Sequence, residues 1–417
     1  KRAAKRRLRA AQETDFESSS SSSIINTLNE KTYARLQQRD SSLKELRITQ
    51  DFFSTGDDSR LRNKLSFGSD HHKWRKARKA LLRHGSLKKL EIHSTLIEDR
   101  ILSDTLQNMP QLTHLSLYNN HIGDAGACAL AKSLETSKRT LLKSLVLDNN
   151  HIFNDGAARL ATALASSHLI CLSLQQNFIS SVGAAALSRM LSQHTCSLES
   201  LNLSRNFIHS AGAQCISHAL TQNTSLRELD VSYNDNEVTL KCLGDAGAKA
   251  FGSMLAKNTH LEVLKLSGNH IGPTGCAAIA KGLACNKSLK ELHLDDNSIG
   301  IVGFLALCRA LETNTTLQVL SLQGTMVPIE RNVQQALVQA LKMNGTMTHL
   351  YSSIVSDECA LLLELNRGLR GILKDDDFAT ALWPFVLERA SKEPSLFMQL
   401  NLVYYALKEK SDLFRPC

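Results

Sequence analysis

The segment that comes nearest to a chemical motif is GACALAKS, residues 126–133, which resembles the phosphate-binding pattern GxxxxGK followed by Ser or Thr. Ala131 replaces the second Gly of that pattern, and the same frame recurs as GCAAIAKG at residues 275–282. A phosphate-binding loop is a Gly-rich turn between a strand and a helix, whereas both of these stretches are Ala-rich and belong to predicted helices. We therefore expect no nucleotide site here.

Fifteen His and ten Cys residues could in principle supply metal ligands or nucleophiles. The chain contains no HExxH, CxxC or GxSxG spacing. His121, His151 and His270 each follow an Asn in separate units, which predicts solvated loop residues. Several Cys residues stand where neighbouring units carry Ala, so we expect buried thiols in a reducing compartment. The sequence predicts no catalytic residue, no metal, no other cofactor and no enzyme activity.

A repeating unit occupies the middle of the chain. Copies of a segment like LTHLSLYNNHI begin at Leu112, Leu142, Leu169, Leu198, Leu226, Leu261, Leu289 and Leu317. Apolar residues at alternate positions predict a strand with one buried face. The second half of each unit, as in GDAGACALAKSL, predicts a helix whose small residues let it approach that strand closely. Because no unit can bury its apolar face alone, the copies must stack.

These segments resemble the leucine-rich-repeat family, whose pattern LxxLxLxxNxL is matched seven times. The Gly, then Ala-rich helix, then Leu of the second half resembles the ribonuclease-inhibitor-like subtype, over roughly residues 87–355. The resemblance implies an α/β fold: a leucine-rich-repeat solenoid, or horseshoe, with an inner parallel β-sheet, outer helices and a helical C-terminal cap.

One Asn recurs at the ninth position of the unit, where a strand gives way to a turn. A buried turn leaves backbone N–H and C=O groups unpaired, and a side-chain amide can satisfy them. We therefore predict a structural Asn ladder rather than a site, which ends at Thr95 and at Thr325. Its members are Asn120, Asn150, Asn177, Asn206, Asn234, Asn269 and Asn297.

The chain divides into four predicted segments. Residues 1–42 form a disordered basic and Ser-rich tail, and residues 43–111 hold irregular N-terminal repeats and a cap. Residues 112–354 are the regular repeats. Residues 355–417 have helical spacing and more aromatic residues, which predicts a helical cap over the open end of the solenoid.

The net charge of +9 is concentrated in two basic runs, residues 1–10 and 71–84, each with six Lys or Arg and no acidic residue. Without them the rest of the chain is slightly acidic. The runs could contact nucleic acid or an anionic membrane, or act as a nuclear-import signal. No run of about 18 apolar residues predicts a membrane span, and the expected compartment is the cytoplasm or the nucleus.

Outward positions of the predicted strands face the hollow of the horseshoe. They combine acidic residues with Tyr and Arg, which are enriched in interface hot spots. We predict a partner-binding surface here, and we expect reversal of Glu228, Asp230 and Asp295 to Lys to abolish binding without unfolding the chain. The predicted partner-binding residues are Tyr118, Asp148, Arg205, Glu228, Asp230, Tyr233, Glu291, Asp295 and Asp296.

The resemblance implies a protein–protein interaction scaffold whose partner, another protein with a basic surface, docks on the concave face, with no small-molecule substrate. One alternative is a regulator of a small GTPase, similar to the Ran-type GTPase-activating proteins, which share this repeat subtype. Those proteins carry a long acidic C-terminal tail, whereas this chain ends in a segment of mixed charge. Another is the sensor half of a nucleotide-binding immune-type receptor, which requires an NTPase domain that these 417 residues do not contain.

Overall fold

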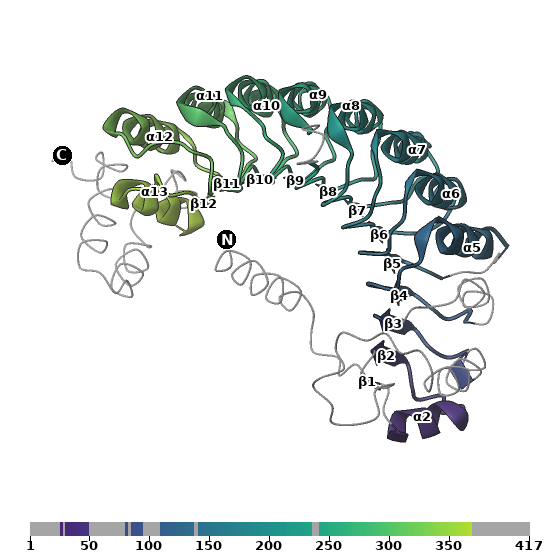
Figure 1. The fold of residues 1–417 in the computed structure, drawn as a ribbon. Helices are drawn as coiled ribbons and strands as arrows, with labels where there is room; N and C mark the ends of the chain where they lie inside the picture. Colours follow the sequence, from purple (N-terminus) through teal and green to yellow (C-terminus); the bar gives the residue numbers. More distant parts are fainter. Residues whose placement is uncertain are drawn as a thin grey trace, which may run out of the picture.

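Strands line the inside of a horseshoe and helices cover its outside (Figure 1). The computed structural model describes residues 26–27, 30–49, 80–81, 85–94, 109–136, 141–235 and 242–368. All strands of this part lie in one 12-stranded sheet in the order of the sequence, and each pairs in parallel with its neighbours. The predicted α/β solenoid is thereby confirmed.

The strands are short, and most hold three residues. They are β1 (Asn26–Thr27), β2 (Glu45–Thr49), β3 (Lys89–His93), β4 (His114–Ser116), β5 (Ser144–Val146), β6 (Cys171–Ser173), β7 (Ser200–Asn202), β8 (Glu228–Asp230), β9 (Val263–Lys265), β10 (Glu291–His293), β11 (Val319–Ser321) and β12 (His349–Tyr351).

The helices follow the strands one by one along the outer face. They are α2 (Glu30–Gln37), α5 (Gly123–Thr136), α6 (Asn154–Leu164), α7 (Ser181–Leu191), α8 (His209–Leu220), α9 (Gly244–Leu255), α10 (Pro273–Cys285), α11 (Gly300–Thr313), α12 (Arg331–Met343) and α13 (Asp357–Gly368).

All four predicted segments lie only partly within the described residues. The tail predicted for residues 1–42 includes β1 and helix α2, which pack onto the solenoid through the buried Leu36, so regular structure begins earlier than we expected. Of the predicted cap, residues 357–368 form α13, where the Asn366 amide donates to the carbonyls of Asn344 and Met347. Residues 369–417 of the predicted cap lie outside the described residues. The same holds for the basic run of residues 1–10, for most of the basic run of residues 71–84, and for residue 95, one predicted end of the Asn ladder.

A single column of leucines fixes the register of the sheet. The second residue of each strand from β2 to β12 is a Leu that pairs with the Leu of the next strand, as Leu145 does with Leu172 and Leu172 with Leu201. These side chains are buried against the helices. Because side chains alternate along a strand, burying this column turns the flanking residues toward the hollow.

The seven Asn of the ladder are buried and joined to the backbone of neighbouring repeats. Asn206 shows the pattern: its amide donates to Leu174 O at 2.9 Å in the preceding repeat and to Leu203 O at 3.1 Å in its own. Its carbonyl oxygen accepts from Ile179 N at 3.1 Å. Thr325, at the next ladder position after Asn297, makes only a local bond, from its hydroxyl to Leu322 O. Each Asn therefore closes its own turn and ties it to the repeat before.

A second Asn row runs along the opposite edge, after the helices, and we did not predict it. Asn286 donates to Leu255 O at 2.8 Å and to Asn258 O at 3.0 Å, while its carbonyl oxygen accepts from Leu289 N at 2.7 Å. The sequence signal is an Asn three residues before the first Leu or Met of a strand segment. The row consists of Asn223, Asn258, Asn286, Asn314 and Asn344.

Glycine near the start of several helices allows a side chain of the preceding repeat to cap them. Asp124 Oδ1 accepts hydrogen bonds from Phe153 N at 2.8 Å and Gly156 N at 2.9 Å, both at the start of α6. A Cβ atom at position 156 would lie 2.5 Å from that oxygen. The absence of a side chain at Gly156 therefore permits an acidic cap, which complements the positive end of the helix dipole.

We predict that Asn206→Ala lowers the free energy of unfolding by about 1–3 kcal/mol, because buried backbone groups in two repeats lose their partner. Urea denaturation followed by circular dichroism measures this. The exposed Gln222 on the same repeat supplies the control, since Gln222→Ala should change the stability by less than about 0.5 kcal/mol. Equal stabilities of the two variants would contradict a structural role for the Asn ladder.

Candidate partner-binding surface

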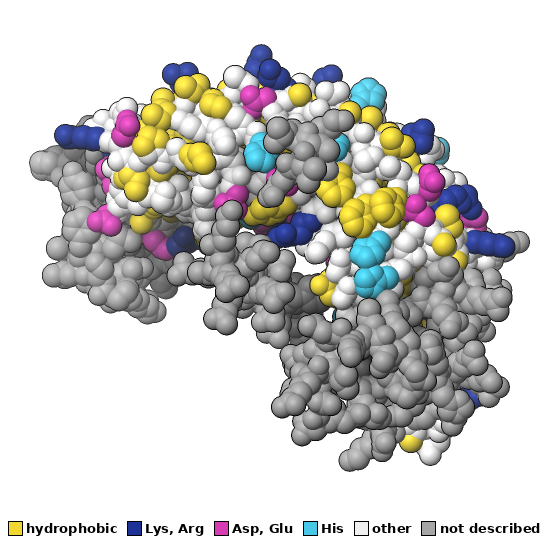
Figure 2. Space-filling view, in the orientation of Figure 1, with side chains coloured by type: hydrophobic (Ala, Val, Ile, Leu, Met, Phe, Trp, Pro, Cys, Tyr) yellow, Lys and Arg dark blue, Asp and Glu magenta, His cyan; other side chains and the backbone are white. Residues whose placement is uncertain are grey.

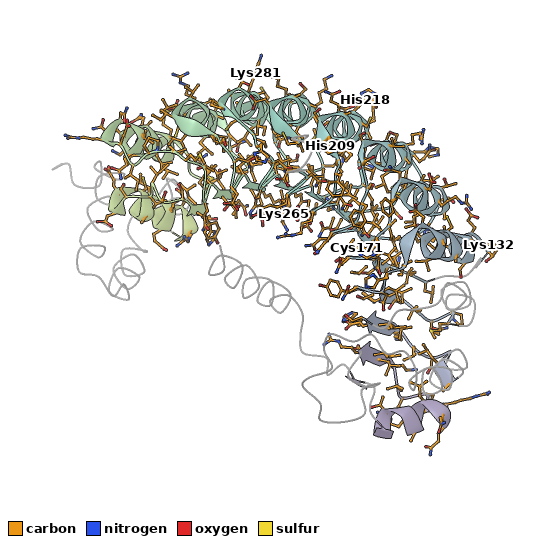
Figure 3. All side chains as sticks on the ribbon, viewed as in Figure 1. Lys132, Cys171, His209, His218, Lys265 and Lys281 are labelled. Atoms are coloured by element: carbon orange, nitrogen blue, oxygen red, sulfur yellow. The ribbon has the colours of Figure 1, made fainter. Side chains whose placement is uncertain are left out.

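The concave face carries a different set of side chains from the outer helices. Figure 3 shows Lys265 and Cys171 on the inner side of the sheet, whereas Lys132, His218 and Lys281 project from the helices outside. Figure 2 shows acidic and basic side chains dispersed over the described face, with no block of one sign.

A shallow polar hollow of about 180 Å³ lies on the strands from β5 to β9. Lys265 is its basic residue, and its Nζ lies 2.9 Å from Glu228 Oε1. Ser200 donates to the other Glu228 oxygen at 3.3 Å. The concave hollow is lined by Leu145, Val146, Cys171, Leu172, Ser173, Ser200, Leu201, Asn202, Glu228, Asp230 and Lys265.

The charges in the concave hollow stabilise one another. Burial alone would lower the pKa of Lys265, but the hydrogen bond and negative charge of Glu228 outweigh it and raise the pKa. Burial raises the pKa of Asp230, against the hydrogen bond from Ser232 N. At neutral pH the hollow thus keeps a Lys–Glu pair within reach of neutral hydroxyl, thiol and amide groups. It can exchange hydrogen bonds with a polar surface of either sign.

Beside the concave hollow, one row of residues has a left-handed backbone. The residue before each ladder Asn, and Gly324 before Thr325, has φ between 53° and 67°. Asn, Asp and Gly tolerate this region, whereas large side chains seldom adopt it. Arg205 and Tyr233 occupy this row with φ of 57° and 55°, so two large side chains sit at an unfavourable backbone geometry on the rim of the hollow.

Arg205, Tyr233 and Asp296 make direct contact, and we call them the rim cluster. The Arg205 guanidinium lies 4.9 Å from the centre of the Tyr233 ring. The Tyr233 hydroxyl donates to Asp296 Oδ2 at 2.7 Å across an intervening repeat. That repeat carries Gly268, where a Cβ would lie 2.2 Å from the Tyr233 ring. The missing side chain leaves the space in which the ring extends to Asp296.

Two of the predicted binding residues prove to be structural. Asp148 is buried, and its Oδ1 accepts from Ser173 Oγ at 2.5 Å and from Gln175 N at 2.9 Å. Asp295 repeats this arrangement, with Gln323 N at 2.8 Å and with Ser321 Oγ. Both carboxylates thus accept hydrogen bonds from the next repeat. Asp230 also accepts a backbone hydrogen bond, from Ser232 N. The expectation that reversing Glu228, Asp230 and Asp295 spares the fold stays a prediction, and its test must include a stability measurement.

The remaining predicted residues are spread along the face. Glu228 and Asp230 meet in the concave hollow, and Glu291 lies beside His293 on β10. Tyr118 is exposed, but it follows β4 and packs edge-on against His93 at 5.8 Å. Four strand spacings separate β4 from β8, or about 19 Å. The structure therefore does not bring Tyr118 together with the rim cluster.

Cys171 is a concave residue that our prediction of buried thiols missed. Four of the nine described cysteines are buried, whereas Cys171 and Cys285 are exposed. The strand pattern contains the signal for Cys171, because it pairs in register with Ser144 and Ser200, both outward positions. Burial raises the pKa of its thiol, and the charges of Glu199 and Glu228 raise it further, so Cys171 is a neutral polar contact at pH 7.

The described residues contain no group of three or more His, Cys, Asp or Glu side chains placed to hold a metal ion. Among these residues no helix is both long and apolar enough to cross a membrane.

We predict that Asp148→Asn stabilises the protein at pH 7 by about 1–3 kcal/mol. Burial raises the pKa of Asp148 to about 6 from an ordinary value of 3.8, so the ionised carboxylate costs stability above that pH. Between the two values the folded chain binds a proton that the unfolded chain does not, and its stability falls as the pH rises. Asn keeps an acceptor for Ser173 and Gln175 without the charge.

Urea denaturation of Asp148→Asn and the parent at pH 4 and pH 7 measures the effect. The gain should be present at pH 7 and should vanish near pH 4, where the parent carboxyl is protonated. A loss of stability at pH 7, or an equal gain at both pH values, would contradict this assignment.

Comparison with known proteins agrees with this architecture. A family model described as TMOD/LMOD Leucine-rich domain matches residues 234–359, and one described as Leucine Rich repeat matches residues 108–131, 194–217 and 222–235. A ribonuclease inhibitor from Sus scrofa is 35% identical over 167 residues, which are 40% of this chain. The chain spans 35% of the length of that relative.

Among solved structures, one titled Leiomodin-1 Actin-Binding Site 2 (ABS2) is 26% identical, with a TM-score of 0.29, and covers 30% of this chain and 74% of its own. The matches of the family models and of the ribonuclease inhibitor agree with a leucine-rich-repeat architecture. Over these stretches the chain is similar to leucine-rich-repeat proteins of the ribonuclease-inhibitor-like type.

Proposed function

We propose that this chain holds another protein against its concave face, with the contact centred on the concave hollow and the rim cluster. Leucine-rich-repeat proteins of this kind generally mediate protein–protein interaction. The relative from Sus scrofa is named as an inhibitor of a ribonuclease, which is a protein partner. A continuous sheet of short strands offers a long, rigid surface suited to such a contact.

The rim cluster is the observation that carries this proposal. Tyr and Arg contribute most where their side chains are already held in the bound geometry, because binding then costs less side-chain entropy. Tyr233 is held by its hydrogen bond to Asp296 and by the space above Gly268, and Arg205 lies against its ring. No hydrogen bond within their own repeats explains why these two large side chains stand at left-handed positions. We therefore assign Arg205 and Tyr233 to contact with a partner.

The surroundings of the rim cluster favour a partner that presents both cations and hydrogen-bond donors. Asp296 is exposed, and Glu291 remains accessible beside His293. Lys265 is already paired with Glu228 in the concave hollow. A basic side chain of the partner would therefore meet Asp296 and Glu291 at the rim, while its polar groups meet Ser200, Asn202 and Cys171.

We expect the double variant Arg205→Asn, Tyr233→Asn to lower the affinity for the partner by about 2 kcal/mol or more, roughly 30-fold. Asn tolerates the left-handed backbone and already occupies the row at 119 and 149, so the fold should be retained. Proteins captured on the immobilised parent chain would be identified, and their binding to the variant measured by surface plasmon resonance.

The matched control is Lys281→Ala with His218→Ala, which changes two exposed residues on the outer helices (Figure 3). This control should bind as the parent does. Equal binding by the rim variant and the parent, with both folded by circular dichroism, would refute the concave site. Loss of binding by the outer variant alone would indicate that the partner contacts the outer helices.

A further inference from the structure

His121 and His151 form a pair on the exposed rim of adjacent repeats, away from the concave hollow. Each follows a ladder Asn and has a left-handed backbone, with φ of 54° and 58°. His121 is exposed and His151 is half-buried. A pair of adjoining histidine side chains is visible on this face in Figure 2. The proposed function uses neither residue.

The two rings converge through their Nδ1 atoms, which lie 3.1 Å apart. Their centres are 4.5 Å apart and their planes are inclined by 69°. Two imidazoles joined head to head by a linear N–H···N bond would have centres about 5.4 Å apart. The shorter separation means that the two rings are bent toward one another about the Nδ1···Nδ1 line, and the inclination is that of an edge-on pair.

This geometry fits two ligands of one metal ion. Imidazole nitrogens bind transition metals at about 2.0–2.1 Å. For an ion at that distance from both Nδ1 atoms, the angle between the two nitrogen–metal bonds would be about 95–102°, and the ring centres would lie about 4.7 Å apart. Both values lie between those of cis octahedral and tetrahedral coordination and agree with the observed pair.

We propose that His121 and His151 form a two-histidine binding site for a transition-metal ion that favours imidazole, such as Cu²⁺, Ni²⁺ or Zn²⁺. The remaining coordination positions are open to water or to a ligand from outside, because the described residues supply no third His, Cys, Asp or Glu to the group. The site therefore binds an ion without enclosing it.

The Asn ladder fixes the spacing of the two ligands before a metal arrives. Asn120 N donates to Asn150 Oδ1 at 2.8 Å, which ties the residue before His121 to the residue before His151. Gly123 N donates to Asn150 O at 2.8 Å, which holds the other side of His121. The Phe178 ring lies 5.5 Å from that of His151 and restricts its rotation. Because the two His side chains are already held in place, binding of a metal ion costs little further conformational entropy.

His270 provides a matched comparison, because it occupies the same repeat position with φ of 55°. Its ring lies 3.2 Å from Asp235 Oδ2, and no second His stands beside it in the described chain. The two-histidine arrangement is therefore a property of the repeats that begin at Leu112 and Leu142, and not of the repeat position itself.

The test uses the full chain titrated with Cu²⁺ at pH 7.5, with glycine present to suppress binding at single histidines. Affinity is measured by calorimetry and the number of coordinated nitrogens by electron paramagnetic resonance. His121→Asn and His151→Asn keep a residue that tolerates the left-handed backbone. Each should weaken the tightest Cu²⁺ site by about tenfold or more and should remove the two-nitrogen signature.

His270→Asn is the control and should leave the tightest site unchanged. The parent should bind Cu²⁺ more tightly than Ni²⁺ or Zn²⁺ and should lose the ion near pH 5, because the ligands must be neutral. The proposal is overturned if the parent shows a single coordinated nitrogen, or if either pair variant, folded by circular dichroism, binds as tightly as the parent. It is also overturned if His270→Asn causes the same loss.

Discussion

Every part of this solenoid depends on how buried turns satisfy their backbone polar groups. A three-residue strand followed by a turn exposes more N–H and C=O groups to the interior than the sheet can pair, and an unpaired buried group costs about 1–3 kcal/mol. Asn206 and its six counterparts supply two donors and one carbonyl oxygen at that point. Because each amide reaches into the preceding repeat, closing one turn also sets the position of the next.

That constraint determines what the concave face can present. With the central Leu column buried and the turns fixed, the outward strand positions and the row of left-handed residues stand at regular intervals along the sheet. Arg205, Tyr233 and Asp296 can meet across three repeats only because Gly268 leaves room between them. The same regularity places His121 beside His151. Both surface features are consequences of identical backbones that carry different side chains.

The sequence was sufficient to predict the repeat, its strand and helix halves and the curved sheet, because these follow from the spacing of Leu, Gly and Ala. The sequence was less informative at positions where one side chain can either contact a partner or accept a hydrogen bond from the next repeat. Asp148 and Asp295 stand at outward positions, yet their carboxylates accept backbone N–H groups of the following strand. The strand pattern gave no sign of that bond. The row that includes Asn286 was missed because its signal precedes the strand and is absent from the first regular copies.

The second Asn row has a consequence for how the native protein opens. Between Asn223 and Asn297 each repeat is tied to its predecessor by amides at both edges of the stack, through ladder residues such as Asn269 and row residues such as Asn286. In the repeats of α6 and α7 the corresponding edge is joined instead by single hydroxyls, those of Thr195 and Ser197. Backbone amides there should exchange with solvent through small local openings, whereas the C-terminal half should exchange as one cooperative unit.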